Sequence, residues 1–318
     1  MTTLRDRYRG TLLGLAVGNT LGLPVESWPS REIRRRYPKG IREIDPLELE
    51  LPWDDDLAQA VILAEAILQH DTLRNDDLAA RLMDWFQSNG RGMGSQTRAV
   101  INALRQGMLP SEAARLVWER DSGQPAGNGA VMRCSPVAMR WPRDRTKLLE
   151  ETENSSRVTH PDPRCSWSAF AVNLAVAEAL NGRTASIDSI GDAMERAGVG
   201  PHTLHAVRDV AGRSLERLRL DGSAIGFTLK AMQAGLWCLE HSEDFEESLV
   251  AVIHAGGDTD TNGAVAGAIL GALHGASSIP DRWTAHISKA DHLISLAERL
   301  LDRATEAGET EVLIERNL

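Results

Sequence analysis

The sequence predicts an all-α protein. Alternation of apolar and polar residues with a period of two, which marks a half-buried strand, is nearly absent. Short loops rich in glycine and proline separate stretches in which apolar residues recur at steps of three and four positions. Examples of that spacing are Leu57, Val61, Ala64 and Leu68, and Leu229, Met232, Leu236 and Leu239. Only the segment 41–51 is compatible with a short extended piece.

Further helices are expected in chain order wherever this amphipathic spacing continues. The stretches are roughly 76–88, 96–107, 111–119, 165–181, 202–218 and 285–304. One more helix follows residue 261, and small residues recur along it every four positions, which lets another helix backbone approach closely. These residues are Gly263, Gly267, Gly271 and Gly275. The pattern predicts a central, tightly packed helix.

Composition limits the class of protein. The 318 residues are 42% hydrophobic and 25% charged, which is typical of a globular protein, and no break resembles a linker, so we expect one domain over residues 1–318. The net charge of −10 argues against a nucleic-acid surface. No stretch reaches the ~18–20 apolar residues of a membrane span, and the apolar run 11–18 is too short and lacks a cleavage site for a secretory signal. Three cysteines without ligand-like spacing suit a reducing compartment, so we expect a cytoplasmic protein. A monomer is the expected assembly, with an oligomer as the open alternative.

Two acidic clusters about 200 residues apart carry the most information. Asp54, Asp55 and Asp56 follow Trp53, and the second cluster is Gly256-Gly257-Asp258-Thr259-Asp260-Thr261. Like charges this close raise one another's pKa or recruit a cation. Carboxylates and hydroxyls are ligands that hard divalent ions prefer. We therefore predict that the fold brings both clusters together around one or two divalent ions.

The two clusters differ in specificity. Asp54 to Asp56 precede a helical run, where aspartate is favoured as N-cap, and for this triplet alone capping is the simpler interpretation. The second cluster needs more than capping, because Gly256 and Gly257 permit backbone conformations closed to other residues. Together the clusters offer five carboxylates and a hydroxyl, enough for a two-ion site.

Other segments suit a substrate pocket. The glycine-rich segments 90–94 and 127–129 could present backbone N–H groups to phosphate, although such segments are also ordinary helix breaks. His160 follows Thr159, and a single histidine is more often structural than functional. Glu26 lies in a mostly apolar stretch and is a candidate acid/base, a candidate metal ligand or a plain surface residue.

In order along the chain, these motifs resemble the ADP-ribosylglycohydrolase family, typified by the dinitrogenase reductase-activating glycohydrolase. The matching pieces cover roughly residues 8–285: Gly14-x3-Gly18-Asn-x-Leu-Gly22, Trp53 to Asp56, Gly127 to Arg133 with Pro136, Thr159-His160, and Gly256 to Thr261. The resemblance implies a compact single-domain orthogonal helical bundle with a central metal site that holds two Mg²⁺ or Mn²⁺ ions. It also implies hydrolysis of the glycosidic bond between ADP-ribose and a protein side chain, or a related ADP-ribose conjugate.

Site residues are assigned by their position in these motifs. The expected metal ligands are Asp54, Asp55, Asp56, Asp258, Asp260 and Thr261. The expected catalytic residues are Glu26, Asp55, Asp56 and Asp258, and the expected contacts to ADP-ribose are Gly92, Met93, Gly94, Asn128, Gly129 and His160. The expected partner is an ADP-ribosylated protein or a small ADP-ribose conjugate.

Three positions depart from the family pattern. The family commonly has Thr or Ser at Asp54, Thr at Leu57 and Asp at Asn19. The extra carboxylate of Asp54 makes the site more anionic, so Ca²⁺ is an alternative ion. A catalytically inactive ADP-ribose-binding or structural homologue, and a hydrolase of small nucleoside conjugates, are alternative functions. A class I isoprenoid synthase is disfavoured, because its Asp-Asp-x-x-Asp spacing is missing after Asp56.

Overall fold

The structure is a computed structural model that describes residues 2–70 and 72–316, with side chains described up to residue 306. Within these ranges it is built from helices and contains no strand. The first half comprises α1 (Leu4–Gly22), η1 (Leu23–Val25), α2 (Ser30–Arg36), η2 (Pro46–Leu49), α3 (Asp55–Gln69), α4 (Asn75–Ser88), α5 (Ser95–Arg105), α6 (Pro110–Arg120), α7 (Ser135–Arg140) and α8 (Arg145–Arg157). The second half comprises α9 (Pro163–Leu180), α10 (Ile187–Arg196), α11 (Pro201–Arg208), α12 (Leu215–Leu218), α13 (Thr228–His241), α14 (Phe245–His254), α15 (Thr259–His274), η3 (Ala276–Ser278), α16 (Asp281–Thr284) and α17 (Ala290–Arg316). The predicted all-α class is confirmed.

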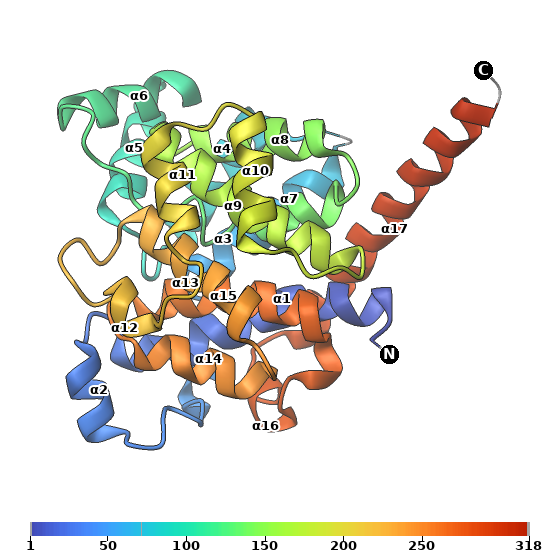
Figure 1. The fold of residues 1–318 in the computed structure, drawn as a ribbon. Coiled ribbons are helices and arrows are strands. Elements are labelled where there is room, and N and C mark those ends of the chain that lie inside the picture. Colours follow the sequence, from blue (N-terminus) through green and yellow to red (C-terminus); the bar gives the residue numbers. More distant parts are fainter. Residues whose placement is uncertain (1, 71, 317–318) are drawn as a thin grey trace.

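Helices α1 and α15 run antiparallel through the middle of the bundle (Figure 1). Glycines on the two helices face each other, so that a Cβ atom on Gly14 would lie 2.1 Å from the carbonyl oxygen of Gly267. Gly18 meets Gly263 and Gly10 meets Gly271 in the same way. The two backbones therefore touch, which confirms the central packed helix. The stripe on α15 ends at Gly271, because Gly275 lies beyond the helix with φ of 84°.

This contact places the end of α1 beside the start of α15. The Thr259 hydroxyl donates to the carbonyl of Gly22 at 2.8 Å. The chain that leaves α1 then pairs with the glycine turn before α15: Ser27 N–H donates to the Gly257 carbonyl at 2.7 Å, and Gly257 N–H donates to the Trp28 carbonyl at 2.9 Å. Residues 230 positions apart in the chain are thus held together by backbone hydrogen bonds.

Three expected elements differ from the structure. The stretch 202–218 is not one helix: α11 ends at Arg208, and Gly212 in the left-handed conformation separates it from α12. The last helix, expected from residue 285, begins at Ala290 after a left-handed Lys289. The segment 41–51 forms the short 3₁₀ turn η2 rather than an extended piece, because Pro46 favours a turn start and the Asp45 carboxylate caps it.

The remaining features of the chain agree with the composition. Cys134, Cys165 and Cys238 are free and buried. None of the described helices is long and apolar enough to cross a bilayer. The C-terminal part of α17 projects from the body of the molecule (Figure 1).

Candidate active site

A cavity of about 750 Å³ gathers most of the predicted site residues. It lies where the N-termini of α3, α5 and α15 meet the loop after α1 and the turn between α8 and α9. Its lining includes Glu26, Asp55, Asp56, Gly92, Gly94, Asn128, Gly129, His160, Asp258, Asp260 and Thr261. Two predicted residues do not line it. Met93 is buried in the hydrophobic core, and Asp54 faces a small neighbouring space beside Glu48 and Arg91.

The first cluster begins α3 as expected. Asp54 is the N-cap residue, yet its side chain makes no capping hydrogen bond, so capping does not account for the triplet. All three carboxylates are buried. Gly92, with φ of 75°, lies against them, since a Cβ atom there would be 2.2 Å from Asp54 Oδ1 and 2.7 Å from Asp55 Oδ1. The nearby Gly94 N–H offsets part of the rise in the pKa of Asp55. The glycine loop therefore wraps the acidic cluster as well as lining the cavity.

The second cluster is presented by a left-handed turn. Gly256 and Gly257 have φ of 73° and 85°, and the helix α15 starts directly afterwards. Asn128 donates from Nδ2 to Asp258 Oδ2 at 2.7 Å, so a residue expected to contact substrate also holds a carboxylate in place. Glu26, Asp258 and Asp260 each offer one oxygen atom, and the three atoms lie within 4.8 Å of one another. Asp54, Asp55 and Asp56 meet the same criterion.

The two clusters adjoin, as the sequence predicted. The Thr261 hydroxyl is near enough to the carboxyl group of Asp56 to offset part of the rise in its pKa, and the charges of Asp56 and Asp260 repel each other. Burial, followed by repulsion from Asp54 and Asp258, raises the pKa of Asp55 to about 8. Burial and neighbouring carboxylates also raise the pKa values of Asp56 and Asp260. So much uncompensated negative charge is costly inside a protein unless a cation joins it.

The donor set fits divalent metal ions. Asp56 Oδ1 and Asp260 Oδ1 are buried and have no hydrogen-bond partner. Of the described residues that line the cavity, none is a lysine or an arginine. Carboxylate oxygens with free lone pairs and a nearby hydroxyl, from Thr261, are the ligands of Mg²⁺, Mn²⁺ and Ca²⁺. Bound cations would satisfy these orphaned oxygens.

Glu26 lies at the exposed edge of this group. Partial burial, with repulsion from Asp258 and Asp54, raises the pKa of its carboxyl group. Ser27, the next residue, has a left-handed φ of 67°, a conformation unusual for a residue with a side chain. The backbone pairing with Gly257 holds this strained loop, and with it Glu26, beside the second cluster.

Sequence reasoning missed the supports of the first cluster. Asn19 donates to Asp54 Oδ2 at 3.5 Å, and Gln59 donates to Asp55 Oδ2 at 3.4 Å. Arg91 pairs with Glu48 at 3.0 Å, and its Nε lies 3.9 Å from Asp54 Oδ1. Gln59 was detectable, because a residue four positions after Asp55 on a helix shares its face. The contact of Arg91 depends on tertiary packing and leaves no local pattern.

His160 is buried behind the glycine segment 127–129. Burial and the positive charge of Arg133 lower its pKa to about 3, so the ring is neutral. A Cβ atom on Gly129 would lie 2.6 Å from the ring carbon Cε1, and one on Gly127 would lie 3.3 Å from Nε2. The glycines of this segment thus make room for the imidazole at the cavity wall.

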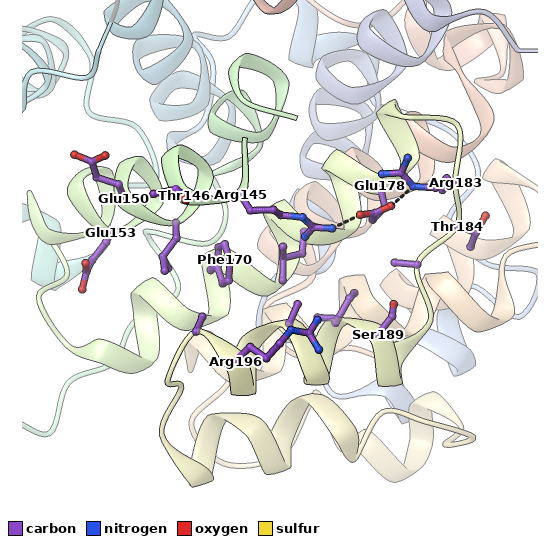
Figure 2. Close-up of a pocket in the computed structure, with 16 residues that line it drawn as sticks. Arg145, Thr146, Glu150, Glu153, Phe170, Glu178, Arg183, Thr184, Ser189 and Arg196 are labelled. Atoms are coloured by element: carbon purple, nitrogen blue, oxygen red, sulfur yellow. Dashed lines mark hydrogen bonds and ion pairs between the residues drawn. The ribbon is translucent and has the colours of Figure 1, made fainter. Parts of the chain in front are cut away.

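A second cavity, of about 830 Å³, lies between α8, α9 and α10 and contains none of the predicted site residues. Figure 2 shows Glu178 between Arg145 and Arg183, and its carboxylate pairs with both guanidinium groups. Apolar side chains such as Phe170 line the rest. It is slightly larger than the acidic cavity, but its charges are matched and no metal-ligand cluster among the described residues lies in it.

Comparison with known proteins agrees with this geometry. The family model of ADP-ribosylglycohydrolases matches residues 1–310. An uncharacterized protein of Archaeoglobus fulgidus is 31% identical over 311 residues, covering 94% of this chain and 97% of that protein. An ADP-ribosylarginine hydrolase of Pseudomonas putida (strain GB-1) is 25% identical, with 97% and 81% covered. The ADP-ribosyl-[dinitrogen reductase] glycohydrolase of Rhodospirillum rubrum is 26% identical, with 96% of each chain covered.

A solved structure supports the same assignment. A chain of an ADP-ribosylglycohydrolase-related protein complex superimposes with a TM-score of 0.77 at 27% identity, covering 96% of this chain and 100% of that chain. All described residues that line the acidic cavity lie within the matched region, residues 1–310. The chain belongs to the ADP-ribosylglycohydrolase family and is an ADP-ribosyl glycohydrolase.

Proposed function

We propose that the protein is a metal-dependent hydrolase that cleaves the glycosidic bond between ADP-ribose and a protein side chain, with arginine as the preferred linkage. The observation that carries this proposal is the meeting of two acidic clusters, with Asp55 and Asp56 from one and Asp258 and Asp260 from the other, at one cavity with unpartnered carboxylate oxygens. An ADP-ribose conjugate is the substrate class that the names of the relatives suggest. A small conjugate would use the same site.

The proposed ligands of two Mg²⁺ or Mn²⁺ ions are Asp54, Asp55, Asp56, Asp258, Asp260 and Thr261. When bound, the ions would neutralise carboxylates, orient the ribose hydroxyls and lower the pKa of water. Asp54 stands apart from the others, because it faces away from the cavity and Arg91 approaches it. We therefore assign it the weakest share in holding an ion and keep Ca²⁺ as a third ion to test.

Groups of the protein itself are assigned to proton transfer, to stabilisation of the transition state and to binding of the diphosphate. Glu26 lies at the cavity edge with a raised pKa, so its carboxylate is placed to accept a proton from the attacking water. The buried aspartates stabilise the positive charge that develops on the sugar in an oxocarbenium-like transition state. Residues 95–97 at the start of α5 line the cavity, and the backbone N–H groups of such a first helical turn suit the diphosphate. No cationic side chain among the described lining residues competes for this role.

Electrostatics supports a cationic leaving group. Five carboxylates of Glu26 and the two clusters line the cavity, namely those of Glu26, Asp55, Asp56, Asp258 and Asp260. Two divalent ions would bring a charge of only +4. The remaining negative charge attracts a guanidinium group and repels an anionic one. Arginine-linked ADP-ribose is therefore preferred over linkages to acidic groups.

The test is a panel of substrates linked through arginine, serine or a nucleotide, assayed after chelation with added Mg²⁺, Mn²⁺ or Ca²⁺. We expect hydrolysis that depends on the added ion and is fastest for arginine. Serine-linked substrate cleaved faster would refute the linkage. ADP-ribose binding in a thermal-shift assay without any cleavage would instead favour the inactive, ADP-ribose-binding alternative.

We also propose that the protein acts as a cytoplasmic monomer. Three reduced, buried cysteines support a reducing compartment. Light scattering on the purified protein measures the mass directly, and a value of twice 34.7 kDa would contradict the monomer.

A further inference from the structure

Arg133 is a buried cation that does not belong to the described lining of the acidic cavity. It is 1% exposed, and its guanidinium makes no ion pair with a carboxylate among the described residues. Nη1 donates to Gln59 Oε1 at 2.5 Å, and Nη2 donates to the Ser155 carbonyl at 3.1 Å and to Thr159 Oγ1 at 2.7 Å. Burying a cation of this kind costs a large desolvation free energy. Its hydrogen bonds therefore indicate a role in orienting the polar groups that accept them, above all Gln59 and Thr159.

On one side the guanidinium orients Gln59. Because the amide oxygen of Gln59 accepts from Arg133, its Nε2 must point the other way, and it donates to Asp55 Oδ2 at 3.4 Å. This order of donor and acceptor cannot be reversed, since a guanidinium has no acceptor atom. Arg133 thus fixes one oxygen of a cavity carboxylate through Gln59.

On the other side the guanidinium orients Thr159. The hydroxyl oxygen accepts from Arg133, and it lies 2.8 Å from Nδ1 of His160. The hydroxyl carries a single hydrogen atom and is fully buried. Nδ1 is the one acceptor within reach among its described hydrogen-bond partners. If Nδ1 carried a proton instead, the threonine hydrogen would be left unpaired in the interior, which is unfavourable.

We propose that Arg133 and Thr159 are positioning residues that hold His160, the residue expected to contact ADP-ribose, as the neutral tautomer protonated on Nε2, so that this N–H is free to be donated to an oxygen atom of the ligand. The ligand in this inference rests on the proposed function. Nε2 faces Gly127 and Gly129, whose Cβ atoms, if present, would be 3.3 and 3.0 Å away, so no side chain of this segment covers it. His160 is itself one of the residues that line the cavity.

Arg133 and Thr159 are in this scheme positioning residues. They act on the substrate only through His160, and Arg133 also acts on Asp55 through Gln59. Through these hydrogen bonds Arg133 is therefore connected both to the end of the cavity with Asp55 and to the end with His160. Loss of the Thr159 hydroxyl should release the imidazole while leaving the Gln59 contact intact.

The experiment measures the tautomer directly by NMR on protein labelled with ¹⁵N-histidine at neutral pH. The His160 signals are assigned by their loss in His160→Gln. We expect a one-bond N–H correlation at Nε2 and an unprotonated Nδ1 in the wild type. Thr159→Ser keeps the hydroxyl and should keep this pattern, whereas Thr159→Val removes it and should give a mixture of tautomers.

Binding of ADP-ribose, measured by calorimetry, completes the test. Thr159→Val should weaken binding about tenfold, the effect of one misdirected hydrogen bond, and Thr159→Ser should restore it. Arg196→Gln in the second cavity is the control and should change neither readout. A wild-type His160 protonated on Nδ1 would overturn the inference, as would unchanged affinity in Thr159→Val despite a changed tautomer. If the wild type binds no ADP-ribose, the proposed function fails together with the ligand assigned here, and the spectrum still confirms or refutes the tautomer.

Discussion

Two cavities of similar size in the described part of the chain differ in electrostatic character, since one has balanced charges and the other is acidic. In the cavity between α8, α9 and α10, of about 830 Å³, Glu178 pairs with Arg145 and Arg183 (Figure 2). The cavity at the start of α3 and α15, of about 750 Å³, is lined by six carboxylates and, among its described residues, by no lysine or arginine. Volume therefore does not distinguish them. Unmatched buried charge does, because a fold retains it at a cost in stability only where a ligand or reaction needs it.

The largest expected effect is the loss of activity when one unmatched carboxylate is neutralised. Asp56→Asn and Asp258→Asn remove a proposed ligand without changing side-chain size, so turnover of arginine-linked ADP-ribose should fall about a thousandfold or more. Binding of Mn²⁺, measured by calorimetry, should weaken in parallel. Turnover within about twofold of wild type for both variants would disprove the site.

Asp56→Asn should also stabilise the protein in the presence of a chelator. The substitution removes a buried charge that is repelled by Asp55, Asp54 and Asp258, so the melting temperature without metal should rise. Glu178→Gln in the second cavity removes a charge that is paired with two arginines and should lower it instead. Shifts in the same direction for both variants would contradict the contrast between the cavities.

The support of the acidic cavity is the next contrast to test. Gly267→Ala would place a Cβ atom 2.0 Å from the carbonyl oxygen of Gly14, so α1 and α15 must separate. We expect a loss of about 3 kcal/mol in the free energy of unfolding and weaker Mn²⁺ binding, because α15 carries Asp258 and Asp260. Gly200→Ala is the matched control: a Cβ atom there has no neighbour within 4 Å, so the substitution should lose only the N-cap preference of glycine over alanine, about 1 kcal/mol or less.

The pH dependence of stability should differ with and without metal. A carboxyl group whose pKa is raised in the folded state stabilises the fold while it is protonated, and this contribution is lost as the pH rises through the folded pKa. For Asp55 that value is about 8. Between about pH 6.5 and 8, the melting temperature should therefore fall with rising pH in chelator and level off above the folded pKa. The fall should be smaller with Mg²⁺ or Mn²⁺. His160, with its pKa lowered to about 3, stays neutral over this range and adds nothing to the slope. Equal slopes under both conditions would mean that no ion joins these carboxylates.

The smallest effect is expected in the second cavity. Arg196 lines it on the exposed surface of α10 and forms no ion pair among the described residues. Arg196→Gln should change the free energy of unfolding by less than about 0.5 kcal/mol and leave turnover unchanged. A clear change in turnover would show that the second cavity is coupled to the first.

Much of this description follows from local sequence. Helical periodicity identifies α3, α4, α5, α6, α9 and α13, because an amphipathic face repeats every three to four residues whatever it packs against. The two acidic clusters are also recognisable in the sequence, because neighbouring carboxylates repel one another unless a cation lies between them. Glycines every four residues on α15 predict close packing, because a glycine has no side chain that would keep a neighbouring helix at a distance.

Tertiary structure alone decided which groups meet. The partner of α15 is the glycine stripe of α1, and only their backbone contact brings the loop with Glu26 beside Asp258. The contacts of Arg133 to Gln59 and Thr159, and of Arg91 to the Asp54 region, join segments that no local pattern relates. Local propensity acts over a few residues, whereas the orientation of a buried hydrogen-bonding group depends on every element packed around it. For that reason the residue types of the site could be predicted from the sequence, and their supports could not.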